Sequence, residues 1–174
     1  FSEVGSRAQF WAPLGVAEAT GDGVVLTARK SWVTSAAEAD SYVWSSRPLA
    51  AEGLSTLWLV PAAATGLEVS GPFDGLGLRG NGSTPIDADA VPVSAGAMLG
   101  DDGTGFEIMV GTVLPAFLLM SAGASVGLAE AAVSAACAHA AAARFEHLDQ
   151  SLAEQPVTRG RLGAMRVRAD AARA

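Results

Sequence analysis

The sequence predicts an α+β fold, in which an antiparallel β-domain over residues 1–102 precedes long helices over residues 103–174. In the first part, short apolar runs such as "GVVLTA", "SYVWSS" and "STLWLVP" alternate with Gly, Pro and Asp, as is typical of strands joined by turns. From Phe106 to about His147 alanine dominates and no cluster of turn residues appears, which predicts one long helix. A loop around Gln155-Pro156 then leads into a second helix.

The composition indicates a globular chain of one or two domains, because 50% of its 174 residues are hydrophobic and 17% are charged. Its 11 basic and 18 acidic residues give a net charge of −7, which argues against nucleic-acid binding because phosphates repel an acidic protein. The single cysteine, Cys137, excludes an internal disulfide, and we expect it to be a small core residue. His139 and His147 have no Cys or carboxylate at ligand spacing, so we expect no metal site.

The run from Ile108 to Ala129 carries no charge and is long enough to span a membrane. It lacks an aromatic belt, and acidic Glu107 and Glu130 flank it where Lys or Arg would be expected. We therefore expect no membrane span and predict that this helix is buried in a helical assembly. Pro115 within it predicts a kink or a disturbed turn.

Trp32 and Thr34 are candidates for a binding face. They lie at i and i+2 in "GVVLTARKSWVT", a run from Gly23 that is rich in β-branched residues and predicts a strand. On an extended chain this spacing places both side chains on one face. The face could belong to the sheet core or could meet a ligand, and the two residues alone favour the core.

Six segments in order resemble the acyl-CoA dehydrogenase family: "FSEVGS", "GVVLTARKSWVTSAAEAD", "STLWLVPAAATGLEV", "LGLRGNGSTPIDADAVPVSAGAML", "GTGFEIM" and "SVGLAEAA". The resemblance covers nearly the whole chain. It implies that residues 1–102 are the family's middle domain, an antiparallel β-barrel or sandwich that contacts flavin and acyl-CoA. Residues 103–174 would be the first two helices of the C-terminal up-and-down helical bundle.

The resemblance also implies FAD-binding residues in the β-domain. The family's Trp-x-Thr segment packs against the flavin ring with the Thr hydroxyl near its reactive nitrogen, and Trp32 and Thr34 match it. "FSEVGS" is similar to the family's Thr-Glu-Pro and Gly-Ser-Asp segment. In this match Ser2 replaces the Thr, and Gly5 and Ser6 form the turn that approaches the flavin and its phosphates. Arg7 stands where the family has Asp.

Two residues of the helical part match family positions that reach the FAD of a neighbouring subunit. These are Arg144, whose guanidinium suits a diphosphate, and Gln155. The Phe-Gly that usually follows the Arg appears here as His147-Leu148. Arg144 could equally be a solvated helix end, where a positive charge favours the helix dipole.

The resemblance implies an FAD-dependent oxidoreductase of fatty acid metabolism that introduces an α,β double bond into an acyl-CoA thioester. The family's base is a Glu, and Phe117 and Leu118 occupy its helix positions, so we expect no catalytic residue in this chain. The expected partners are acyl-CoA, further subunits in a homo- or hetero-oligomer (dimer or tetramer), and an electron-acceptor protein. Two alternatives are a non-catalytic partner subunit and a flavin monooxygenase on the same fold.

We also expect this chain to be part of a longer, cytoplasmic protein. The base would then lie outside these 174 residues.

Overall fold

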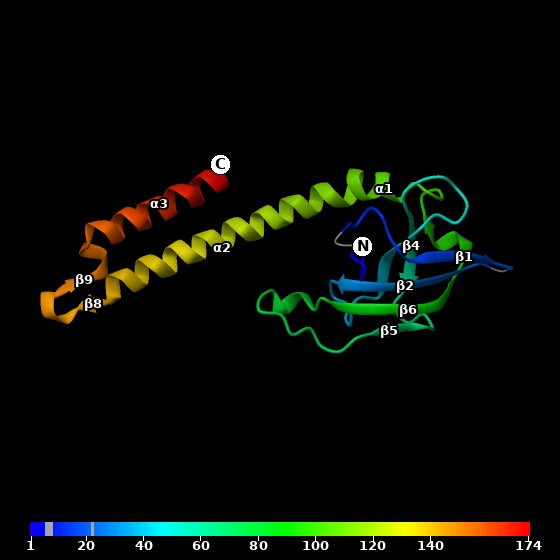
Figure 1. Ribbon diagram of the computed structural model, residues 1–174, viewed down its shortest axis with the longest axis horizontal. Coiled ribbons are helices and arrows are strands. Elements are labelled where there is room, and N and C mark those ends of the chain that lie inside the picture. The colour runs from blue at the N-terminus through cyan, green and yellow to red at the C-terminus, as the bar shows by residue number, and fades with distance from the viewer. Residues whose placement is uncertain (6–8, 22) are drawn as a thin grey trace. The chain divides into compact units, whose positions relative to one another are not determined.

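The strands of the N-terminal part form two antiparallel sheets in the computed structural model, which describes residues 1–5, 9–21 and 23–174 (Figure 1). The chain divides into two compact units, Phe1–Val113 and Leu114–Ala174. The first sheet has the order β1-β2-β6-β5 and consists of β1 (Val16–Thr20), β2 (Gly23–Val33), β6 (Thr84–Val93) and β5 (Leu67–Val69). The second has the order β3-β4-β7 and consists of β3 (Ser41–Ser46), β4 (Thr56–Pro61) and β7 (Met98–Leu99).

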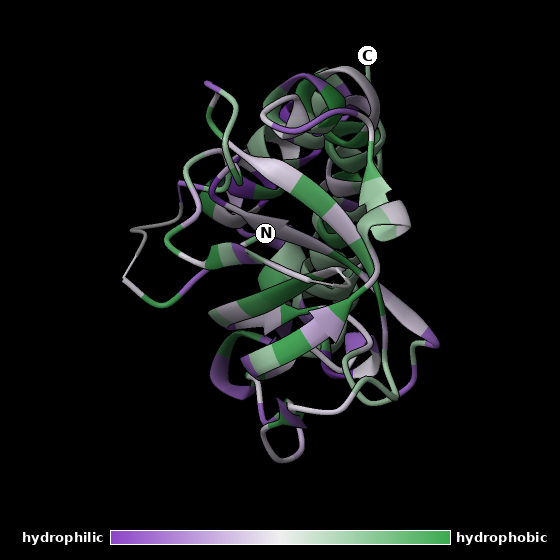
Figure 2. Ribbon diagram, turned by 90° about the vertical axis from the view of Figure 1, so that its right-hand side faces the viewer, coloured by the Kyte–Doolittle hydropathy of each residue, from purple (hydrophilic) through white to green (hydrophobic). Residues whose placement is uncertain are grey.

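Antiparallel sheets followed by a long helix confirm the α+β prediction. The described strands of the first unit, β1 to β7, form two separate sheets and no closed barrel, and the sandwich stays a prediction. One apolar cluster contains side chains of both sheets. Its largest members are Trp44 and Trp58, a directly opposed pair on β3 and β4 that is buried almost completely. Apolar and polar bands alternate along the strands in Figure 2, as expected for sheets with one buried face.

In the central strand β2, buried and exposed side chains alternate as far as Lys30, and the alternation stops there. Val24, Leu26, Ala28 and Lys30 are all buried, and each faces a buried residue of β6. Between Lys30 and Val33 the register shifts: three steps along β2 correspond to the two steps from Ile86 to Thr84 on β6. The additional β2 residue is a β-bulge, which reverses the phase of the strand.

A carboxylate joins the loop after β3 to the segment that enters the helices. The Asp102 carboxylate accepts hydrogen bonds from the backbone amides of Leu49 (2.9 Å), Ala50 (2.8 Å) and Ala51 (2.8 Å), and from the Thr56 hydroxyl (2.5 Å). Burial raises the pKa of this carboxyl, but the four hydrogen bonds outweigh burial and lower its pKa to about 2.

The helical part begins with α1 (Gly105–Ile108), continues through a π-helical turn (Met109–Val113) and extends along α2 (Leu114–Ala142). The π turn contains Gly111, whose carbonyl would bond the amide of residue 115 in a regular helix. Pro115 has no amide proton, so the predicted disturbance is present.

The long helix ends at Ala142, five residues before the predicted end. A short hairpin of β8 (Arg144–Phe145) and β9 (Gln150–Ser151) follows, and then α3 (Pro156–Arg173). The hairpin ends the helix because its backbone groups pair with each other, and Asp149 adopts the left-handed conformation at its tip. Within this unit, Arg166 of α3 donates two hydrogen bonds to the Glu130 carboxylate of α2.

Much of α2 lies open to solvent. Among the described residues, the continuous helical run Gly105–Ala142 is long and apolar enough to cross a membrane, and 6% of its most apolar window is buried. Cys137 is exposed, so the prediction of a core cysteine is wrong. The reason is that α2 is apolar on all sides, and position along such a helix does not identify a buried face. Burial of the Ile108–Ala129 run in an assembly stays a prediction.

Candidate functional site

The N-terminal segment pairs with the end of β2 that carries the bulge. The Ser31 amide donates to the Ser2 carbonyl at 3.0 Å, and the Val4 amide donates to the Arg29 carbonyl at 3.0 Å. The Ser2 and Ser31 hydroxyls also lie within hydrogen-bond distance, 2.9 Å. Ser2 is therefore brought beside the residue that precedes Trp32. Gly5 follows in a turn with φ of 89°, a conformation that glycine adopts without strain.

The bulge turns Trp32 out of the core. Trp32 is 61% exposed although it lies two residues from buried Lys30, while Val33 packs against the core cluster. Thr34, one residue past the strand, is also exposed. The Phe73 ring meets the Trp32 ring edge-on, with centroids 6.3 Å apart.

A strained turn fixes Thr34. Ser35, the next residue, has φ of 55°, and its amide donates to the Asn81 carbonyl at 2.8 Å. The side-chain oxygen of Asn81 accepts the Ser83 amide at 3.1 Å. The Ser83 hydroxyl is buried and lies 3.4 Å from the Thr34 hydroxyl. Asn81 therefore bonds both Ser35, which follows Thr34 in the chain, and Ser83, whose hydroxyl lies near that of Thr34.

Beneath this surface lies a buried ion pair that the sequence analysis missed. Lys30 and Glu3 form a salt bridge, and their side chains are 3% and 2% exposed. Burial lowers the pKa of the Lys30 ammonium, and the Glu3 carboxylate partly opposes that effect. The sequence does hint at a buried Lys30, because Lys30 continues the every-second-residue pattern of Val24, Leu26 and Ala28, whose side chains face the core.

Arg144 and Gln155 lie in the second unit, in the connection between α2 and α3. The Arg144 guanidinium donates to the carbonyl (2.8 Å) and the carboxylate (2.7 Å) of Asp149, across the β8–β9 hairpin. The Gln155 amide donates to the Gln150 side-chain oxygen at 3.0 Å. Arg144 is therefore a hairpin residue and not a helix end. Of the predicted site residues, Ser2, Gly5, Trp32 and Thr34 lie in the first unit, and Ser6 lies outside the described residues.

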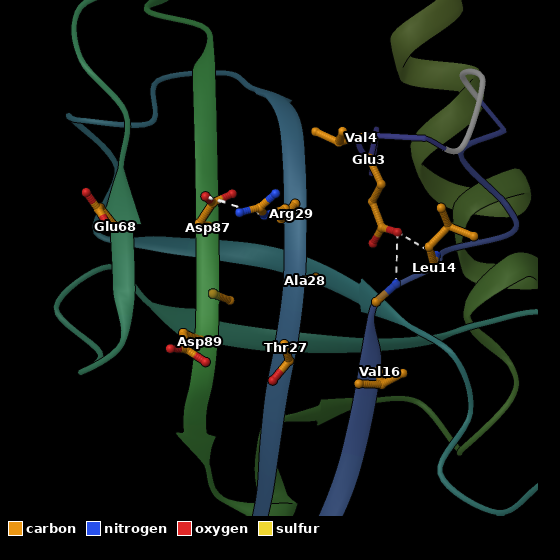
Figure 3. A pocket seen from close by; sticks show the side chains of 12 residues that line it. Glu3, Val4, Leu14, Val16, Thr27, Ala28, Arg29, Glu68, Asp87 and Asp89 are labelled. Carbon is orange, nitrogen blue, oxygen red and sulfur yellow. Dashed lines mark hydrogen bonds and ion pairs between the residues drawn. The ribbon is translucent and has the colours of Figure 1, made fainter.

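A hollow lies over the outer face of the first sheet, and twelve residues line it (Figure 3). The Glu3 carboxylate stands at one side of it and accepts the Leu14 and Gly15 amides. None of Ser2, Trp32 and Thr34 lines this hollow. Its charged lining is mainly acidic, with Glu68, Asp87 and Asp89 against Arg29, which is unfavourable for a phosphate-bearing ligand. The Trp32 end of β2 is the better candidate site for such a ligand.

The part of the chain that the structure describes contains no group of three or more His, Cys, Asp and Glu side chains placed to hold a metal ion.

The fold matches that of a known class of protein. A probable acyl-CoA dehydrogenase from Mycobacterium abscessus superposes with a TM-score of 0.86 at 23% identity, covering 98% of this chain and 45% of that one. The family domain described as "Acyl-CoA dehydrogenase, middle domain" matches residues 2–91. The chain belongs to the acyl-CoA dehydrogenase family.

Two curated relatives define the extent of the match. The mitochondrial short-chain specific acyl-CoA dehydrogenase of Bos taurus is 32% identical over 142 residues, which is 80% of this chain and 34% of the relative. The probable acyl-CoA dehydrogenase YngJ of Bacillus subtilis is 30% identical over 123 residues, 69% of this chain and 32% of the relative. The chain therefore spans about a third of the length of these relatives.

Proposed function

We propose that this chain forms part of an FAD-dependent acyl-CoA dehydrogenase that introduces an α,β double bond into an acyl-CoA thioester. The observation that carries the proposal is the exposed indole of Trp32, which along the chain lies between Ser31, whose hydroxyl is 2.9 Å from that of Ser2, and the exposed Thr34. A bulge places this large aromatic ring in solvent, although the strand phase would otherwise bury it. An exposed aromatic surface with adjacent donors suits a flat, polar, conjugated ligand.

The residues present fit a flavin. Trp32 would cover the ring, Thr34 would donate a hydrogen bond to it, and Ser2 and Gly5 would contact its polar edge. When bound, FAD would supply hydride acceptance from a substrate carbon. A donor at Thr34 stabilises negative charge that develops in the transition state more than it stabilises the ground state. Arg144 and Gln155 would contact the cofactor of a neighbouring subunit, which requires an oligomer.

The base that removes the substrate proton is proposed to lie outside these residues. Phe117 and Leu118 occupy the family's helix positions and cannot accept a proton. We place the protein in the cytoplasm, with acyl-CoA as substrate and an electron-acceptor protein as redox partner. The length of the acyl group would be set by parts of the pocket beyond this chain.

The test uses the full-length protein and two site variants, Trp32→Leu and Thr34→Val. We expect wild type to retain yellow flavin through gel filtration and to bleach it anaerobically with acyl-CoA. Both variants should lower the bleaching rate, by about tenfold or more for Thr34→Val, which loses the donor. The matched control is Trp11→Leu, because Trp11 is also an exposed tryptophan (38%), and its ring meets that of Phe10 edge-on. Equal bleaching in Thr34→Val and wild type would contradict the proposal.

The apolar pair Phe117-Leu118 favours one second candidate, a non-catalytic partner subunit that completes a neighbour's site. A flavin-free full-length protein that raises the turnover of a co-expressed dehydrogenase subunit would support it.

A further inference from the structure

The Glu3–Lys30 ion pair is fully satisfied. The Lys30 ammonium has three protons to donate, and it has three acceptors: the Glu3 carboxylate, the Ser45 carbonyl at 2.7 Å and the Ser45 hydroxyl at 2.9 Å. It also lies 5.1 Å from the centre of the Trp44 ring, within cation–π range. The other Glu3 oxygen accepts the Leu14 and Gly15 amides, the latter at 2.9 Å.

Burying two charges is unfavourable unless their geometry compensates, and an apolar pair of similar volume is often at least as stable. Overall stability is therefore a weak explanation for the pair. The pair joins four segments of the chain: the N-terminal segment that contains Glu3, the segment before β1, strand β2, and strand β3 through Ser45. Three of these segments lie in the first 33 residues, and two of them carry the proposed flavin contacts.

The pair lies close to those contacts along the chain. Glu3 directly follows Ser2 and precedes Gly5 by two residues, and Lys30 precedes Trp32 by two residues. Glu3 and Lys30 also pair as an isolated β-bridge, flanked by the Ser31–Ser2 and Val4–Arg29 backbone hydrogen bonds. A short N-terminal segment held by one bridge and two such bonds has little stability of its own. Its position depends on the side chain that anchors it in the core.

We propose that the Glu3–Lys30 pair is a positioning clamp that locks the Ser2–Gly5 segment onto β2 beside Trp32, an inference that rests on the proposed function. Neither residue touches the cofactor. The clamp sets where the Ser2 hydroxyl and the Gly5 turn lie relative to the indole, and it has a consequence that can be observed without flavin: protection of the Val4 and Ser31 amides from exchange.

The experiment uses the full-length protein with Glu3→Gln, Lys30→Met, the double variant Glu3→Leu/Lys30→Met, and the control Arg29→Gln. Arg29 is the neighbour of Lys30 on β2, and its own ion pair with Asp87 is 3.8 Å long and solvent-exposed. Amide exchange over residues 1–5 and 29–33 is measured by mass spectrometry, together with melting temperature and FAD affinity. Ser45→Ala removes one acceptor of Lys30 and leaves both charges paired, so it tests the clamp if a single charge variant fails to fold.

Each single charge variant, and Ser45→Ala to a smaller extent, should exchange faster over both segments and should bind FAD about tenfold more weakly or worse. Arg29→Gln should match wild type. The double variant should recover the melting temperature, because no charge is left unpaired, but it should keep fast exchange and weak FAD binding. If the pair only stabilised the fold, the double variant would instead recover the melting temperature, the slow amide exchange and the FAD affinity.

The clamp is overturned if Ser45→Ala and the single variants exchange at wild-type rates, or if the double variant recovers FAD affinity with its melting temperature. A wild-type protein that binds no FAD would contradict the proposed function, and the exchange measurement would still decide whether the clamp exists.

Discussion

Asp102 is a residue whose ionisation supports the fold. Its pKa of about 2 lies below the usual aspartate value of about 3.9, so the folded state binds its proton less readily than the unfolded state. The contribution to stability is therefore complete above about pH 4 and is lost as pH falls toward about 2. We expect Asp102→Asn to lower the unfolding free energy at pH 7 by about 1–2 kcal/mol and to flatten its dependence on pH in this window.

Urea unfolding of the full-length protein between pH 2 and pH 7, followed by tryptophan fluorescence, measures this effect. The neighbouring exposed residue provides the control, since Asp101→Asn should leave the profile unchanged. If Asp102→Asn retains the wild-type slope between pH 4 and pH 2, the four hydrogen bonds do not act as inferred.

A second residue-scale prediction concerns two glycines with opposite surroundings. Gly103 has φ of 85°, and a Cβ there would lie 2.4 Å from the Glu52 carbonyl oxygen. Gly160, inside α3, has nothing within 4 Å of its Cβ position. Gly103→Ala should destabilise the protein by about 2 kcal/mol or more. Gly160→Ala should stabilise α3 by about 0.5–1 kcal/mol, because alanine loses less backbone entropy in a helix. The denaturant midpoints of both variants measure these effects. A midpoint that shifts in the same direction in both variants would contradict the prediction.

At the scale of elements, the sequence identified what depends on local pattern. The strand predicted from Gly23 runs to Val33, and the disturbed turn expected at Pro115 is present. Trp32 and Thr34 are both exposed, and their sharing one face stays a prediction, because Thr34 lies in the turn beyond the strand. The face itself could not be read from the sequence, because continuing the alternation of Val24 to Lys30 would bury Trp32, and the bulge that reverses it depends on the register with β6.

Long-range partners were also beyond the sequence. A lysine at a position of β2 that faces the core suggests a buried charge, but nothing local identifies Glu3, 27 residues away, as its partner. The helix predicted to about His147 ends at Ala142, because the Arg144–Ser151 and Phe145–Gln150 pairs form a hairpin there. The sequence did not reveal this hairpin, because its turn contains no Gly or Pro. For Arg144 and Gln155, a family resemblance supplies a role, and the structure shows only their contacts within the hairpin.

At the scale of the whole molecule, the 174-residue polypeptide alone should neither retain stoichiometric FAD nor oxidise acyl-CoA. The proposed base lies outside it, and Arg144 and Gln155 are proposed to serve a neighbouring subunit, so only part of the cofactor's interactions is available. Apolar side chains exposed on α2, such as Leu119 and Met120, should also make it associate. The visible spectrum after gel filtration with FAD and a dye-linked turnover assay test this, and a stoichiometric yellow fraction would contradict it.

The solvent-facing thiol on α2 gives the molecule a built-in reporter. Cys137 is the only cysteine among the 174 residues, so within this chain a maleimide probe attaches at one site without any substitution. If α2 is covered in the intact assembly, as we expect from its apolar length, the thiol of the full-length protein should react at least about tenfold more slowly than that of the isolated polypeptide. The rate should rise again when dilution or mild denaturant separates the subunits. Equal rates in both forms would show that this side of the helix stays in water throughout. A fluorophore at the same sulfur would then follow assembly in real time.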